Sequence, residues 1–163
     1  MNRPPAAPTP ADQQRLALLI EAEAIQLGEF VALLEREEAL LTSGDTDALL
    51  ALTQDKNERY RRLQRLSDDR ALLLGRLGRV TSDTTLRELL ADLPRVLGRW
   101  DEVIGLARQA SERNAINGKL ILERMAHNQA ALSVLLAAAD QPPLYDAEGH
   151  TRAVGGGRML GSA

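Results

Sequence analysis

The chain contains no cysteine, and only four of its 163 residues are aromatic (one Trp, two Tyr and one Phe). Without cysteine, it can form neither disulfide bonds nor metal sites with thiolate ligands. The net charge at pH 7 is only −3, so the chain lacks the basic surface that nucleic acid or anionic lipid requires. We therefore expect no nucleic-acid partner.

Long apolar segments are also missing. The longest apolar run, around residues 130–139, is too short to cross a bilayer as a helix. Residues 1–10 contain prolines but no apolar core, so they do not resemble a secretory signal. From these two observations we expect a cytoplasmic protein without membrane insertion.

Leucine and alanine dominate the chain, whereas β-branched residues are few. This composition favours helices packed on helices over any sheet, so the predicted fold class is all-α. Hydrophobic spacing and turn residues predict three long helices and one short one, with the approximate bounds 9–42, 45–78, 85–93 and 94–139.

Short connections between long helices favour antiparallel neighbours. We therefore expect an elongated antiparallel bundle that forms one domain over residues 1–140. Residues 141–163 have no helical period and include three consecutive glycines at 155–157, so a flexible C-terminal tail is predicted there.

The predicted helix starts rest on capping residues. Thr9 is the expected N-cap of the first helix, with Pro10 at the first helical position, and Asp45 is the expected N-cap of the second. The run from Thr85 to Glu88 matches a capping box for the short helix. Pro94 is expected either to kink this helix or to open the next one.

Charged residues interrupt the apolar stripes of the first two helices. Glu23 and Glu37 lie in the first stripe, and Lys56, Arg59 and Arg70 lie in the second. Long basic side chains can cover apolar surface with their stems while their charges reach water. We expect this arrangement for the three basic residues.

The last helix carries asparagines in its apolar stripe. At about 100° per residue, Asn114 shares a face with apolar residues from Val96 to Leu132, and Asn117 and Asn128 lie near the edge of that face, beside Gly118. Buried amides must find hydrogen-bond partners, and a buried Asn can fix helix register or partner choice. The pattern predicts a buried stripe built for specific pairing, with pairing inside the bundle or contact with water as the alternative.

A second apolar stripe lies roughly opposite, formed by Ile116, Leu120, Ala131, Val134 and Ala138. It has two interpretations. The last helix could pack against both other long helices, or the stripe could be a docking face for a partner helix.

The sequence contains no recognisable catalytic or cofactor motif. His127 and Glu123 are spaced for a shared metal but have no third ligand at a suitable spacing. The glycines at 155–157 do not complete a phosphate-binding loop, and there is no Gly-x-Ser-x-Gly motif. We expect neither an enzyme nor a bound cofactor or metal.

The stretch from Ser111 to Ile121, Ser-Glu-Arg-Asn-Ala-Ile-Asn-Gly-Lys-Leu-Ile, resembles the signature of FlgN-type flagellar export chaperones. The run from Arg124 to Leu132 and the segment Leu-Tyr-Asp-Ala-Glu-Gly at 144–149 are similar to that family as well. The resemblance implies a cytoplasmic chaperone of the flagellar type III export system. Such a chaperone binds hook–filament junction (hook-associated) proteins, keeps them soluble and unpolymerised, and delivers them to the export apparatus.

The resemblance places client contact on the last helix after about Asn114 and on the tail. The candidate partner-binding residues are Asn114, Asn117, Gly118, Ile121, Met125, Asn128, Leu132, Leu135, Leu144, Tyr145, Met159 and Leu160. The alternative hypothesis is a structural coiled-coil adaptor or self-assembling helical bundle with no secretion role. A homodimer in the absence of client stays open under either hypothesis, because a long exposed stripe can pair with itself.

Overall fold

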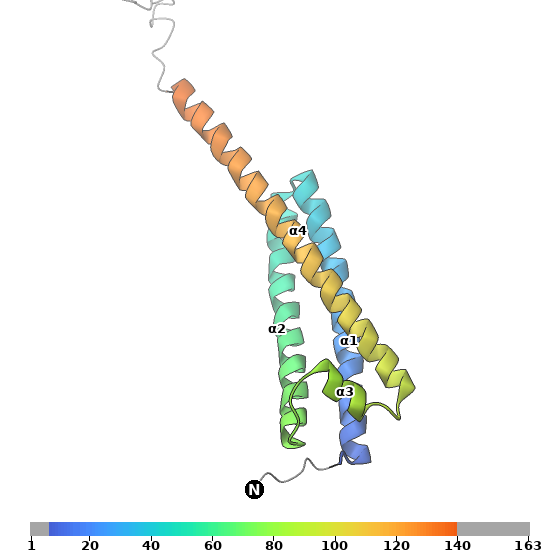
Figure 1. Cartoon of the computed structure of the whole chain (residues 1–163). Coiled ribbons are helices and arrows are strands. Elements are labelled where there is room, and N and C mark those ends of the chain that lie inside the picture. Colours follow the sequence, from blue (N-terminus) through green and yellow to red (C-terminus); the bar gives the residue numbers. More distant parts are fainter. Residues whose placement is uncertain (1–6, 140–163) are drawn as a thin grey trace, which may run out of the picture. The chain divides into compact units, whose positions relative to one another are not determined.

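A computed structural model describes residues 7–139, which form four helices and no strand (Figure 1). The helices are α1 (Pro10–Ser43), α2 (Thr46–Arg76), α3 (Asp83–Leu89) and α4 (Pro94–Ala139). The predicted all-α fold with three long helices and one short helix is confirmed. The predicted flexible tail at 141–163 lies outside the described residues.

The chain divides into two compact units, residues 1–122 and 123–163. The first unit contains α1, α2, α3 and α4 as far as Leu122. The described part of the second unit is the remainder of α4, residues 123–139.

The ends of the first two helices follow the predicted capping. Thr9 Oγ1 accepts a hydrogen bond from the Asp12 backbone N–H at 3.2 Å, and the Asp12 carboxylate accepts one from the Thr9 N–H at 3.0 Å. Gly44 ends α1 in the left-handed region, with φ of 83°, which glycine adopts without a steric penalty. Asp45 Oδ1 then accepts from the Ala48 N–H at 3.0 Å and caps α2.

The predicted capping box at the start of α3 is wrong. Ser82 is the N-cap, and its Oγ accepts from the Thr85 N–H at 3.1 Å. Ser82 has the extended backbone typical of an N-cap, and Asp83 in the first turn adds a negative charge where the helix favours one. The Glu88 carboxylate instead lies 3.4 Å from Arg79 Nη1. Pro94 opens α4, which is one of the two roles expected of it.

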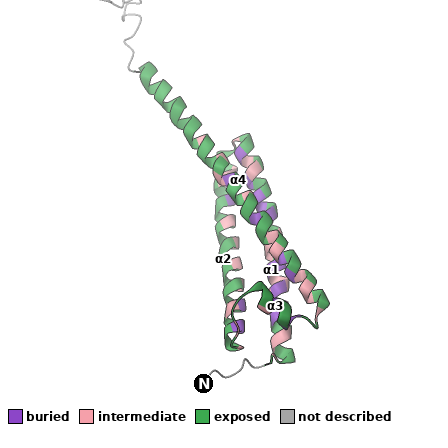
Figure 2. Cartoon of the chain, viewed as in Figure 1, coloured by how far each residue is buried: buried purple, intermediate pink, exposed green. Residues whose placement is uncertain are grey.

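Two apolar clusters form the core of the first unit (Figure 2). The larger joins all four helices through Leu16, Ile20, Ala24, Leu73, Leu74, Leu86, Leu89, Leu90, Trp100 and Val103. The smaller consists of Phe30, Val31, Leu34 and Ala110. Leu86, Leu89 and Leu90, from α3 and its C-cap, are buried in the larger cluster, so the short helix covers one end of the core formed by the long helices.

A buried ion pair joins α1 to α2 within the larger cluster. Arg70 Nε donates to both oxygens of Glu23 at 3.0 and 3.1 Å, although Glu23 is only 3% exposed and Arg70 9%. The Arg70 guanidinium also lies over the Trp100 ring of α4, 4.9 Å from its centroid, a cation–π contact. Burial raises the pKa of Glu23. The expectation that the charge of Arg70 reaches water is wrong, because a carboxylate faces it from the adjacent helix.

A second cluster of polar side chains also joins α1, α2 and α4. Lys56 Nζ of α2 lies 2.8 Å from Glu37 Oε2 of α1. Asn117 of α4 donates through Nδ2 to Glu37 Oε2 at 2.8 Å and to the Leu34 carbonyl at 2.9 Å. Asn117 is fully buried, and its Oδ1 has no hydrogen-bond partner within residues 7–139. We call these two groups the polar layers. Each contains a carboxylate from α1, a cation from α2 and a side chain from α4.

The polar layers set the register of α1 against α2. Glu23 pairs with Arg70, and Glu37 pairs with Lys56. Glu37 lies two heptads after Glu23 on α1, whereas Lys56 lies two heptads before Arg70 on α2. This match requires antiparallel helices. A shift of one turn would leave buried charges without partners, which is far more costly than a mismatch between leucines.

Ion pairs on the outside show that α4 runs in the same direction as α1. Near the start of α4, Arg99 Nη2 lies 2.6 Å from Glu21 of α1. Further along both helices, Arg113 lies 3.0 Å from Glu35 and 3.1 Å from Glu38. In the first unit, the three long helices therefore run up, down and up, with α3 in the connection before α4 (Figure 1).

Removing one member of the first polar layer should be more damaging than removing both. Replacing Arg70 by Met leaves the Glu23 carboxylate buried without its counter-charge, and the free energy of unfolding in urea should fall by about 3–5 kcal/mol. The double variant Glu23→Leu, Arg70→Met should recover most of this loss. Arg62→Met is the control, because its pair with Glu58 is exposed and should contribute about 0.5 kcal/mol. A double variant no more stable than Arg70→Met would contradict the assignment.

The side chain of Trp100, the one tryptophan of the chain, should report the titration of Asp83. Trp100 Nε1 donates to Asp83 Oδ1 at 2.7 Å and Arg87 Nε donates to Oδ2 at 3.0 Å. These hydrogen bonds, the one from Trp100 foremost, lower the pKa of Asp83 from 3.8. The unfolded state therefore binds the proton more readily, and the stabilisation present above pH 3.8 is lost as the pH falls through the lowered value.

We expect the NMR signal of the indole N–H to titrate with a midpoint below 3.8, under conditions where circular dichroism shows the helices intact. Asp83→Asn should abolish this titration. A midpoint at or above the ordinary value of aspartate would show that the hydrogen bond from Trp100 does not persist in solution.

Candidate functional site

The described part of the second unit exposes an unusual amount of apolar surface. Every residue from 123 to 139 except Arg124 is exposed (Figure 2). The large apolar side chains among them are Met125 (61% exposed), Leu132 (56%), Val134 (69%), Leu135 (67%) and Leu136 (58%). Large apolar side chains gathered on an exposed surface mark a site of interaction more often than scattered ones do.

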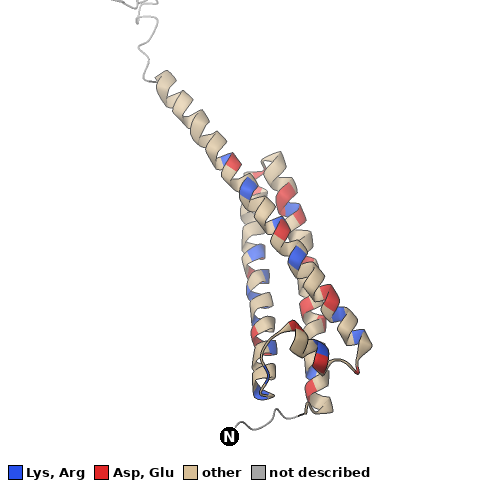
Figure 3. Ribbon diagram, in the orientation of Figure 1, with Lys and Arg blue, Asp and Glu red and all other residues tan. Residues whose placement is uncertain are grey.

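No Asp, Glu, Lys or Arg occurs between residues 125 and 139, so this part of α4 is without formal charge (Figure 3). Its residues are largely alanine and leucine, with neither glycine nor proline, and these are strong helix formers. The helix therefore forms from intrinsic propensity, although its side chains are not packed. Such a surface offers apolar area and a few amide or hydroxyl groups, but no electrostatic attraction.

The exposed side chains are arranged for contact with another helix. Met125, Asn128, Leu132 and Leu135 follow one another at alternating spacings of three and four residues, the repeat by which helices pack side by side. We call these four residues the α4 stripe. Asn128 is exposed, and its amide has no hydrogen-bond partner among the described residues.

The asparagines predicted to be buried together are separated by the structure. Asn117 is buried, and its amide already bonds to Leu34 and Glu37, so it is not free to contact a partner. Asn114 and Asn128 are exposed, and the prediction that they are buried is wrong. The buried residues Val103, Ala110 and Asn117 repeat every seven residues, and Asn114 lies on the adjacent face of the helix, which is exposed there.

The remaining predicted residues that the structure describes lie on the surface or near it. Ile121 is 39% exposed, and its neighbour Leu122 is 67% exposed. Gly118 is partly buried, yet a Cβ built there would meet no atom within 4 Å, so no close approach requires glycine. Of the second predicted stripe, Ile116 is 49% exposed and Val134 is 69% exposed; neither is buried against the other helices. The candidates Leu144, Tyr145, Met159 and Leu160 lie outside the described residues.

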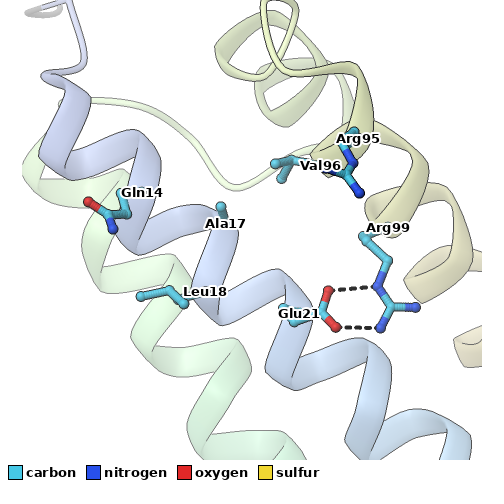
Figure 4. A pocket seen from close by; sticks show the side chains of 7 residues that line it. All are labelled: Gln14, Ala17, Leu18, Glu21, Arg95, Val96 and Arg99. Carbon is cyan, nitrogen blue, oxygen red and sulfur yellow. Dashed lines mark hydrogen bonds and ion pairs between the residues drawn. The ribbon is translucent and has the colours of Figure 1, made fainter.

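A hollow of about 560 Å³ lies between α1 and the start of α4 (Figure 4). It is lined by Gln14, Ala17, Leu18, Glu21, Arg95, Val96 and Arg99. Arg99 donates to both oxygens of Glu21, from Nε at 2.7 Å and from Nη2 at 2.6 Å, and these bonds lower the pKa of Glu21. The lining offers this ion pair beside apolar surface such as Leu18, and it holds no nucleophilic side chain.

Sequence reasoning missed a smaller hollow of about 390 Å³ in the first unit. It is lined by Phe30, Lys56, Asn57, Tyr60, Ala110, Ser111 and Asn114. Tyr60 is 58% exposed. As one of only four aromatic residues in the chain, it was the one feature of the sequence that could have drawn attention to this hollow. Asn114 thus lines a largely apolar hollow of the bundle and is not part of its core.

The described residues provide no constellation for catalysis or metal binding. Within residues 7–139, no three His, Asp or Glu side chains gather where they could hold a metal ion. None of the helices in this range is long and apolar enough to span a membrane. The α4 stripe is therefore the strongest candidate site, and its chemistry is that of a surface for another polypeptide.

Comparison with known proteins identifies the family of the chain. The sequence model of the FlgN protein family matches residues 12–153 of the chain. The flagella synthesis protein FlgN of Yersinia enterocolitica is 26% identical over 153 residues, which span 88% of this chain and 97% of the relative. No solved structure gave a significant match. Because the family match extends over most of the sequence, the chain belongs to the FlgN family of flagellar synthesis chaperones.

Proposed function

We propose that this protein is a cytoplasmic export chaperone for the hook–filament junction proteins of the flagellum, and that the α4 stripe holds the client. The observation that carries the proposal is the uncharged run of exposed residues at 125–139. A helix that had only to remain in water would carry charges on its exposed positions. The relative of Yersinia enterocolitica is named a flagella synthesis protein, which supports a flagellar client.

The chemistry of the stripe suits an unassembled hook–filament junction protein. Polymerising proteins have amphipathic helices whose apolar faces are covered only after assembly, and these faces aggregate when left uncovered. A helix with apolar side chains at spacings of three and four can cover such a face by helix-to-helix packing. Apolar packing on an uncharged surface covers the client without ion pairs.

The first unit anchors the helix that carries the site. Asn117, inside the second polar layer, ties α4 to α1 through the Leu34 carbonyl and the Glu37 carboxylate. Trp100 ties the start of α4 to Arg70 and Asp83. These contacts fix α4 within the first unit before any client is bound. Ordering this part of the chaperone therefore adds no entropic cost to binding.

A single charge in the α4 stripe should abolish client binding. Leu132→Asp places a carboxylate in the middle of the proposed contact, where it would be buried without a partner, and affinity for a purified junction protein should fall about a hundredfold or more. Isothermal titration calorimetry would measure the change. Ser133→Asp is the matched control, because it adds the same charge one residue away, about 100° around the helix, and should retain near-normal affinity.

Both variants must first be shown to keep the helix content of the parent. Ile121→Asp and removal of residues 140–163 should also weaken the complex, because the family resemblance extends client contact to both. If Leu132→Asp, Ile121→Asp and the truncated chain all bind the client as the parent does, the proposed client site is wrong.

The alternative is a structural adaptor or self-assembling bundle whose α4 stripe pairs with a second copy. Light scattering separates the two functions. A one-to-one complex with a junction protein supports the chaperone. A tight homodimer that the same junction protein cannot dissociate supports the adaptor.

A further inference from the structure

We propose that Asn128 determines which client helices the α4 stripe accepts and in what register, an inference that rests on the proposed function. The occupant of the stripe is then a helix of the client. It has an uncharged apolar seam that carries one hydrogen-bonding side chain opposite Asn128.

The spacing of the stripe identifies the occupant as a helix. Met125, Asn128, Leu132 and Leu135 lie three, four and three residues apart, and this repeat matches the side-chain rows of a second helix. A lipid surface is a poor match, because helices that lie on membranes carry Lys or Arg on their polar face, and residues 125–139 have neither.

Within this repeat, Asn128 is the one position with an amide. It is exposed and has no hydrogen-bond partner among the described residues, whereas Met125, Leu132 and Leu135 are apolar. A helix packed over the stripe would remove the amide from water. The free amide must then bond to the occupant, or the complex loses affinity. The stripe therefore rejects a purely apolar helix and favours one with a polar group in the right place.

The same chain already uses an asparagine in this way. Asn117 occupies a position in the buried seam of α4, and its Nδ2 bonds to the Leu34 carbonyl and the Glu37 carboxylate. Its neighbours in that seam, Val103 and Ala110, are apolar. Asn117 thus shows what a seam amide does once a neighbouring helix covers it.

The test compares two ligands of the full-length chain. One is a purified hook–filament junction protein. The other is a synthetic amphipathic helical peptide whose seam contains only leucine and alanine. Asn128→Leu should weaken binding of the junction protein about tenfold, because its polar group loses its partner. The same change should strengthen binding of the peptide about tenfold, because no amide is then buried unpaired.

His127→Leu is the matched control. It also converts an exposed polar residue to leucine, one position away and outside the α4 stripe, and the ratio of the two affinities should stay within about threefold of the parent. A merely structural role of Asn128 would change both affinities in the same direction and would leave this ratio unaltered.

The outcomes distinguish a failure of the role of Asn128 from a failure of the proposed chaperone function. A ratio that Asn128→Leu leaves within about threefold of the parent, while the parent binds the junction protein, overturns the role of Asn128 alone. A parent that binds no junction protein overturns the proposed function, and this inference with it. A parent whose stripe stays occupied by a second copy in the presence of the junction protein, as shown by light scattering, overturns the client helix as the occupant.

Discussion

The pairing of buried carboxylates on α1 with buried cations on α2 is the constraint on which the rest of the bundle depends. Leucine seams alone tolerate a slip of one turn, since one leucine packs much like another. Glu23 and Glu37 do not, because each would lose its cation and remain charged away from water. The polar layers therefore cost solvation energy and specify one register. They also determine where Trp100 and Asn117 of α4 can lie, because each contacts a member of one layer.

Along α4, the apolar side chains change from buried to exposed. Up to Leu122 the helix buries Trp100, Val103, Ala110 and Asn117, and the amide of Asn117 bonds within the bundle. From residue 125 to 139 the side chains are apolar or neutral and exposed. The apolar residue types that form the core of the first unit are exposed in the described part of the second. The proposed function assigns this exposed surface to the client.

Local signals in the sequence were sufficient for the helices and for the first two caps. Thr9 and Asp45 act within three residues of themselves, so no tertiary information was needed. Ser82 was missed because Thr85, three residues further along, also has a hydroxyl group and is followed by a Glu at the spacing of a capping box. The pairing partners of Arg70 and Lys56 could not be read locally, although the equal spacing of two heptads on both helices was present in the sequence. Asn114 was misplaced because the buried face of α4 continues beyond Trp100 through Val103, Ala110 and Asn117. Which of two adjacent helix faces packs depends on tertiary contacts, and residue spacing alone does not give these.

The absence of charge between residues 125 and 139 has a consequence for control of the complex. Contacts between charged proteins weaken as ionic strength rises, because salt screens them. Apolar contacts are not screened, and salts that are excluded from protein surfaces strengthen them. A complex formed through this part of α4 would therefore not weaken as the ionic strength of the cell rises. Its release would require a competing apolar surface that displaces the helix, and a change of salt or of surface charge would not suffice.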